Sequence, residues 1–176
     1  MFNDLVVIIS CEHNTQHFCG ATCRRIFLIQ DFVPTALYFG NMFSNETKLR
    51  VRYAETDRMG YVYYGVYAQY FEVGRVEALR SLGMSYRRME EDGIMLPVRD
   101  LNATYHKPAF YDDLLTVRTT IVALPAVRIQ FAYEVRNENG DLLTEALTTL
   151  VFIDRATNKP CRAPEDLLKL LAPFYG

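Results

Sequence analysis

The chain has 176 residues, a length that suits one domain with an appendage or one large domain. Half of its residues are hydrophobic and 23% are charged, so it can bury a core and is not a disordered protein. Its 19 basic and 21 acidic residues lack the basic excess of a dedicated nucleic-acid binder. No apolar run approaches the roughly 20 residues of a membrane span, and four cysteines make no disulfide scaffold. We therefore expect a cytoplasmic protein.

Residues 1–41 differ from the rest because they show no sustained helical or strand periodicity. They contain several residues of types that bind zinc: Cys11, His13, His17, Cys19 and Cys23. Their spacing matches no closed zinc pattern, so no metal site is expected. A lipoprotein-like box at Ile8–Cys11 lacks the positive charge that should precede it. We favour a third interpretation: residues 1–41 are a poorly structured leader or a mis-called start, and residues 42–176 form the domain.

The first part of the domain predicts one strand and one long helix. Residues 48–54 alternate between polar and apolar side chains, as a half-buried strand does. Residues 65–82 carry apolar side chains at helical spacing, and Gly83 is a natural helix stop. Ser85 is expected to cap a short second helix that ends at Gly93.

Strands dominate the rest of the chain. Extended segments are predicted over residues 94–105, 115–123, 127–135 and 143–153, with a two-residue hairpin turn at Asn139–Gly140 and a last short helix from Pro164. One curved antiparallel sheet wrapped around the long helix would bury both apolar surfaces. This α+β arrangement is the hotdog fold. Its exposed sheet edges favour pairing into a homodimer or homotetramer.

Residues 53–75 carry a more specific pattern. An acidic residue, two spacers, Gly, a hydrophobic-Val-aromatic run and an aromatic residue at the helix start occupy Asp57, Gly60, Tyr61, Val62, Tyr63 and Tyr64. Tyr67 and the pair Glu72-x-x-Arg75 follow on the helix. The segment resembles acyl-CoA thioesterases of the 4-hydroxybenzoyl-CoA thioesterase branch of the hotdog superfamily, including the Tol-Pal-associated members. The resemblance covers about residues 44–160.

The resemblance implies that the protein hydrolyses an acyl-CoA to the free acid and CoA without a cofactor. It implies that Asp57 is the nucleophile or general base, and it places the backbone N–H of Tyr64 on the thioester oxygen. A helix N-terminus does present unpaired N–H groups. Gly60 allows a tight turn and Gly65 a close approach of substrate. The other substrate-binding candidates are Tyr61, Val62, Tyr63, Tyr67 and Arg128.

Other roles for the acidic residues stay open. An Asp before a helix is often a cap or a partner in a loop salt bridge, and the surrounding motif is what favours catalysis by Asp57. Another hotdog branch uses a Glu on the helix as its catalytic carboxylate, which makes Glu72 a candidate. Arg75, three residues further on, gives Glu72 a structural partner, so an architectural role is favoured. Glu55, two residues before Asp57, is a secondary candidate for the catalytic carboxylate. Many relatives have His where this chain has Tyr64, so hydrolysis here should not require a histidine; His106 is expected to be a surface residue.

Two other function classes remain. A dehydratase would need a His–acid pair on the loop and helix, and the missing His argues against it. A non-catalytic acyl-CoA-binding or assembly module would keep Asp57 as a loop anchor.

Basic residues should bind the CoA phosphates. The candidates are Arg99, Lys107, Arg128, Arg155, Lys159 and Arg162. Two questions stay open: which acyl group the substrate carries, and whether the oligomer is a dimer or a tetramer.

Overall fold

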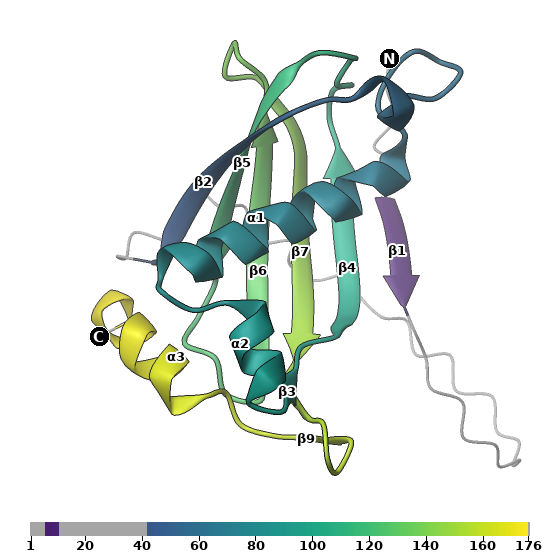
Figure 1. Cartoon of the computed structure of the whole chain (residues 1–176). Helices are drawn as coiled ribbons and strands as arrows, with labels where there is room; N and C mark the ends of the chain where they lie inside the picture. Colours follow the sequence, from purple (N-terminus) through teal and green to yellow (C-terminus); the bar gives the residue numbers. More distant parts are fainter. Residues whose placement is uncertain (1–5, 11–41, 176) are drawn as a thin grey trace, which may run out of the picture.

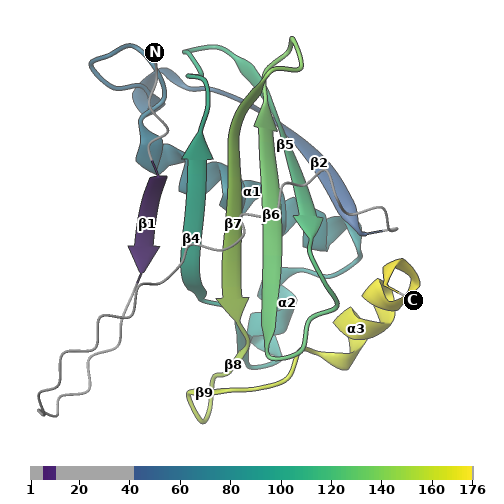
Figure 2. The same ribbon diagram turned by 180° about the vertical axis from the view of Figure 1, so that it is seen from behind.

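A computed structural model describes residues 6–10 and 42–175, and its main element is a six-stranded antiparallel sheet (Figure 1). The strand order is β1-β4-β7-β6-β5-β2. The strands are β1 (Val6–Ser10), β2 (Ser44–Arg50), β4 (Val98–Tyr105), β5 (Leu114–Ile121), β6 (Arg128–Arg136) and β7 (Leu142–Val151). Helix α1 (Tyr67–Ser81) lies across one face of this sheet, and Figure 2 shows the opposite face. The α+β hotdog architecture is confirmed.

Smaller elements surround this core. A three-stranded sheet joins β3 (Ile94–Met95), β8 (Ile153–Asp154) and β9 (Lys159–Pro160). The helices are α2 (Tyr86–Glu91) and α3 (Glu165–Leu171), and the short 3₁₀ turns are η2 (Tyr53–Glu55), η3 (Tyr64–Val66) and η4 (Ala172–Phe174). As predicted, Ser85 caps α2: its hydroxyl accepts a hydrogen bond from the N–H of Arg88 at 3.2 Å.

The core lies between α1 and the face of the sheet toward it. The alternation predicted over residues 127–135 places Phe131 and Tyr133 of β6 on this face, and both are buried. The ring of Tyr133 packs on Phe71 of α1, with 4.7 Å between centroids. Burying a side chain of this size stabilises the fold by about 1.5–3 kcal/mol. The helix and the sheet are therefore packed as one unit.

Close packing of α1 on β5 depends on a glycine inside the helix. A Cβ built on Gly74 would lie 2.5 Å from the hydroxyl oxygen of Thr119 and 3.0 Å from a methyl carbon of Val117. Real Cβ contacts are not that short, so the helix can approach the strand this closely only because position 74 has no side chain.

The first strand of the domain ends earlier than predicted. The alternation predicts a strand over residues 48–54, but β2 ends at Arg50 and η2 follows. The carboxylate of Glu55 accepts a hydrogen bond from the N–H of Arg52 at 2.7 Å, and the N–H of Glu55 donates to the carbonyl of Arg52 at 3.0 Å. These reciprocal bonds satisfy the backbone locally, so the chain turns out of the sheet.

The β6–β7 hairpin is present, but the predicted two-residue turn is wrong. The N–H of Gly140 donates to the carbonyl of Asn137 at 3.0 Å, and the N–H of Asp141 donates to the Asn137 side-chain oxygen at 2.9 Å. Gly140 has a φ of 81°, whereas Asn139 is not among the positive-φ residues. A two-residue type I′ turn needs positive φ at both central positions. The side chain of Asn137 favours the longer turn.

The candidate zinc ligands between Cys11 and Cys23 lie outside the described residues. Within residues 6–10 and 42–175, no group of three or more His, Cys, Asp or Glu side chains could hold a metal ion. Across the same ranges, none of the helices is long and apolar enough to cross a membrane. Strand β1 pairs with the outer side of β4, from Val6 opposite Thr104 to Ser10 opposite Asp100.

Candidate active site

Asp57 lies in a tight loop between η2 and η3. Its N–H donates to the carbonyl of Tyr61 at 2.9 Å, and its carbonyl accepts from the N–H of Gly60 at 3.0 Å. Gly60 adopts a φ of 85°, which a residue with a side chain would adopt only with strain. One carboxylate oxygen of Asp57, Oδ1, accepts from the N–H of Met59 at 2.8 Å. In the part of the chain that the structure describes, Oδ2 has no hydrogen-bond partner, so it is available for chemistry.

The start of η3 presents backbone donors beside this loop. The N–H groups of Tyr64 and Gly65 have no backbone carbonyl partner among the described residues, while the N–H of Val66 donates to the carbonyl of Tyr63 at 2.9 Å. The hydroxyl of Tyr105, from the end of β4, donates to the carbonyl of Tyr64 at 3.2 Å. Unpaired N–H groups at a helix start attract negative charge. This helix start can therefore stabilise an oxyanion.

The Asp57 loop, the start of η3 and the corner between β4 and β5 line one pocket of about 170 Å³. Its walls are mainly aromatic and aliphatic, and they consist of Asp57, Met59, Tyr61, Val62, Tyr64, Tyr67, Tyr105, His106, Lys107 and Pro108. An apolar pocket with a few polar groups directed into it is the usual form of a small-molecule site. Asp57 and Tyr64, the two catalytic candidates predicted from sequence, thus line one pocket.

Most of the predicted site residues gather here. Five of them line the pocket: Asp57, Tyr61, Val62, Tyr64 and Tyr67. Tyr63 is exposed, and its ring lies against that of Tyr64, with 4.4 Å between centroids. Gly60 and Gly65 shape the backbone on either side of the lining residues. The motif therefore describes a real spatial cluster.

Arg128 lies away from this pocket. It begins β6 opposite Val151 of β7, whereas the pocket residue Tyr105 lies opposite Thr144. Thr144 and Val151 are seven residues apart on β7, a separation of about 23 Å. The strand register therefore brings Arg128 to the other end of the sheet. Among the basic residues considered for the CoA phosphates, Lys107 is the one that lines the pocket.

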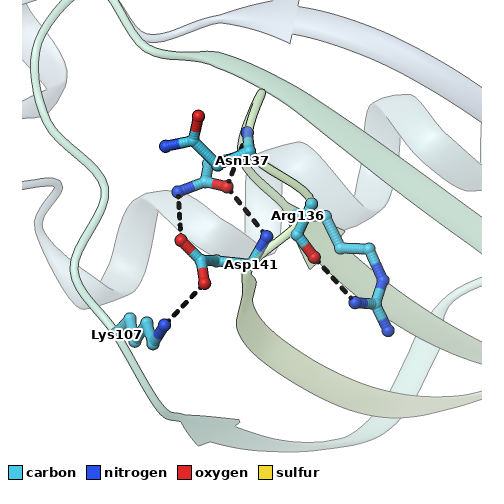
Figure 3. A network of polar contacts seen from close by, with 6 residues as sticks. Lys107, Arg136, Asn137 and Asp141 are labelled. Carbon is cyan, nitrogen blue, oxygen red and sulfur yellow. Dashed lines mark hydrogen bonds and ion pairs between the residues drawn. The ribbon is translucent and has the colours of Figure 1, made fainter.

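The corner that contributes Lys107 is fastened to the β6–β7 hairpin (Figure 3). The ammonium group of Lys107 bonds Asp141 at 2.7 Å, and the amide of Asn137 donates to the same carboxylate at 3.2 Å. The bond from Lys107, followed by that from Asn137, lowers the pKa of Asp141. The N–H groups of His106 and Lys107 both donate to the carbonyl of Leu143, at 2.8 and 3.1 Å. This wall of the pocket is therefore held by backbone and side-chain contacts.

The imidazole of His106 bonds Glu145 of β7, with 2.9 Å between Nε2 and a carboxylate oxygen. Ala146 lies opposite Tyr133, which faces α1 through Phe71. Because side chains alternate along a strand, the neighbouring Glu145 points to the opposite face. The imidazole is therefore drawn toward the face of the sheet that α1 does not cover, as expected for a surface residue.

The helix pair Glu72 and Arg75 lies outside the pocket. Arg75 is only 8% exposed and lies 3.6 Å from the carboxylate of Glu72, which is exposed. Neither residue lines the pocket of Asp57. This arrangement fits the architectural role that the sequence favours for Glu72.

Glu55 is buried, with 6% exposure, and its side chain turns toward α1. The hydroxyl of Tyr70 donates to it at 2.8 Å, and the guanidinium of Arg52 lies 2.6 Å from its other oxygen. Burial alone would raise the pKa of Glu55, but the hydrogen bonds from Arg52 and Tyr70 outweigh burial and lower the pKa below its ordinary 4.5. Glu55 is therefore ionised in the folded protein at neutral pH.

This environment predicts an acid sensitivity. Because the pKa of Glu55 is lower in the folded state, the stability it contributes is complete above the unfolded pKa of about 4.5 and is lost as the pH falls through the folded pKa. We expect Glu55→Gln to lower the free energy of unfolding at pH 7, and the difference from the parent to shrink as the pH falls below 4.5. Urea unfolding across this range measures it. A difference that does not depend on pH would contradict the assignment.

Comparison with known proteins identifies the family. Residues 51–171 match the family described as the thioesterase-like superfamily. The YneP protein of Bacillus subtilis is 35% identical over 119 residues, which cover 68% of this chain and 86% of that protein. The acyl-CoA thioester hydrolase YbgC of Escherichia coli O6:H1 is 30% identical over 120 residues, covering 68% and 90%.

Solved structures agree with the sequence matches. A crystal structure of DHNA-CoA thioesterase from Staphylococcus aureus superposes with a TM-score of 0.72 and 39% identity, covering 75% of this chain and 91% of that one. Family, relatives and fold coincide on the region that contains the Asp57 loop and α1. The chain therefore belongs to the thioesterase-like superfamily, and it is a thioesterase of the hotdog fold.

Proposed function

We propose that the protein hydrolyses an acyl-CoA to the free acid and CoA, with Asp57 as nucleophile or general base and the N–H of Tyr64 as oxyanion donor. One observation carries the proposal: Asp57 and Tyr64 line the same pocket, and the N–H of Tyr64 has no backbone partner among the described residues. Hydrolysis of a thioester needs a group that attacks or activates water, and donors for the oxygen that becomes negative. These two groups supply both.

Asp57 is suited to either of two routes. As a nucleophile, Oδ2 attacks the carbonyl carbon, the carbon–sulfur bond breaks to release the CoA thiolate, and water then hydrolyses the acyl-enzyme anhydride. As a general base, the carboxylate takes a proton from the water that attacks the same carbon. In both routes the bond from Met59 to Oδ1 holds the carboxylate in place. Negative charge on the substrate oxygen is then stabilised by the N–H of Tyr64.

Release of free thiol from a panel of acyl-CoAs tests the proposal. The panel should contain short and long aliphatic acyl groups and an aromatic one, because one relative bears the name DHNA-CoA thioesterase. Turnover of at least one substrate supports the enzyme. Binding of acyl-CoA without turnover of any substrate favours the alternative, a non-catalytic acyl-CoA-binding or assembly module in which Asp57 only anchors the loop.

His106 offers a direct check on the roles of the pocket residues. We expect His106→Asn to keep kcat within about twofold of the parent, because its imidazole bonds Glu145 on the face opposite α1. Thiol release at pH 6 to 8 measures this. A loss of tenfold or more, with the protein still folded, would show that an imidazole takes part in the hydrolysis after all.

A cytoplasmic location and association into a homodimer or homotetramer belong to the same proposal. The support for association is architectural, since an antiparallel sheet in a small domain leaves strand edges that can pair with another copy.

A further inference from the structure

Glu55 is bonded to three parts of the molecule that meet at the site. Its carbonyl accepts a hydrogen bond from the N–H of Tyr63 at 2.9 Å, and Tyr63 immediately precedes the oxyanion donor Tyr64. Its carboxylate accepts from the hydroxyl of Tyr70 in the first turn of α1 at 2.8 Å. The same carboxylate accepts from the backbone and the guanidinium of Arg52, at 2.7 and 2.8 Å. One buried residue thus joins both ends of the Asp57 loop to the helix.

We propose that Glu55 is a positioning residue for thioester hydrolysis, which holds the Asp57 loop against α1 and so fixes the carboxylate of Asp57 relative to the N–H of Tyr64. The inference rests on the proposed function, because it assigns Glu55 no chemistry of its own. A misplacement of about 1 Å at a reacting group can cost about a hundredfold in rate. A rigid connection between loop and helix therefore matters for kcat.

The contact with Tyr70 continues into the wall of the pocket. The ring of Tyr70 packs edge-on against Tyr67, with centroids 5.6 Å apart, and Tyr67 packs in the same way against Tyr105 at 5.2 Å. Tyr105 in turn donates its hydroxyl to the carbonyl of Tyr64. Both Tyr67 and Tyr105 line the pocket. A connected set of tyrosines therefore links Glu55 to the helix start from the other side.

Glu55 is not placed to react with substrate itself. It does not line the pocket of Asp57, it is 6% exposed, and both of its carboxylate oxygens accept hydrogen bonds. Its charge is nevertheless needed, because its partners are all donors. In either orientation of a Gln side chain, its NH₂ group would face an N–H donor of Arg52, where an acceptor is required. The amide variant therefore loosens the connection while it keeps the size of the side chain.

The test compares Glu55→Gln, Tyr70→Phe and the double variant with the parent, using thiol release from the best acyl-CoA of the panel. We expect each single variant to lower kcat about tenfold to a hundredfold, with KM changed less than about twofold. The double variant should be no worse than the poorer single variant, since both changes break the same contact. Glu77→Gln, at a half-buried position of α1 outside the pocket, and Tyr111→Phe, on an exposed loop, are matched controls that should retain the parent kcat.

The pH profile separates positioning from other roles. Glu55→Gln should keep the shape of the parent's pH profile of kcat at reduced height, acid limb included, because the inference assigns Glu55 no proton transfer in the hydrolysis. Disappearance of that limb would make Glu55 the base and overturn the inference. So would a Glu55→Gln variant that is folded by circular dichroism at the assay temperature and keeps kcat within twofold. If Glu55→Gln does not fold, Tyr70→Phe alone decides by the same kcat criterion.

A comparison with Asp57→Asn keeps the two proposals apart. If Asp57→Asn retains full activity, the proposed function of Asp57 fails and Glu55 has nothing to position. If Asp57→Asn is inactive while Glu55→Gln and Tyr70→Phe are fully active, only the positioning role fails.

Discussion

Replacing Asp57 with Asn is expected to lower kcat for acyl-CoA hydrolysis by about 10²–10⁴-fold with little change in KM. The amide can neither attack the thioester carbon effectively nor accept a proton from water at neutral pH. Its side-chain oxygen can still accept the hydrogen bond that the N–H of Met59 gives to Oδ1. The loop should therefore keep its shape, and the loss should be in the chemical step. Thiol release under saturating substrate measures it.

A matched control is available on another loop. Asp112 is exposed and has a φ of 70°, a conformation that Asn tolerates well. Asp112→Asn makes the same chemical change away from the pocket and should leave kcat unaltered. If folded Asp57→Asn keeps more than a tenth of the parent kcat, Asp57 is neither the nucleophile nor the general base.

Replacing Gly74 with Ala is expected to lower the free energy of unfolding by about 1–3 kcal/mol. Helix propensity alone predicts the opposite sign, because Ala is better than Gly inside a helix by about 1 kcal/mol. The added Cβ would lie 2.5 Å from the hydroxyl oxygen of Thr119, so α1 must move away from β5 or the strand must shift. Chemical denaturation with unchanged cooperativity would report the loss.

Removing the obstacle should restore part of this stability. In Gly74→Ala with Thr119→Ala, the side-chain oxygen nearest to the new Cβ is gone, and the one tight contact left is that with Val117 at 3.0 Å. The double variant should therefore be more stable than the sum of the two single effects predicts. A Gly74→Ala variant more stable than the parent would show that the helix–sheet separation is not set at this position.

The parts of the fold that sequence predicts well are those where one periodicity continues without interruption. The alternation around Phe131 and Tyr133 predicts β6, and the apolar stripe over residues 65–82 predicts α1. Boundaries were missed where a side chain takes over backbone hydrogen bonds. Glu55 ends β2 early, and Asn137 lengthens the β6–β7 turn. Such local bonds leave no trace in a hydrophobic pattern.

In the predicted site, residues close together in the chain were identified from sequence, whereas most residues brought in by strand pairing were not. Asp57 and Tyr64 are close in the chain, so a motif is enough to bring them together. The wall from Tyr105 to Pro108 reaches the same pocket only through the pairing of β4 with β7. Arg128 was expected near substrate, yet the register of β6 places it at the far end of the sheet. Strand register depends on the whole sheet and cannot be read from one segment.

The two edge strands of the sheet, β1 and β2, protect it from pairing with other chains in different ways. On one side, β2 carries Glu46, Lys48 and Arg50, charges that discourage unwanted pairing with other chains. On the other side, the five residues of β1 pair with residues 100–104 along the outer edge of β4. A shortened chain that begins at Met42 would present β4 as an open template for a further strand. The presence of residues 6–10 would then decide how readily copies pair through β4.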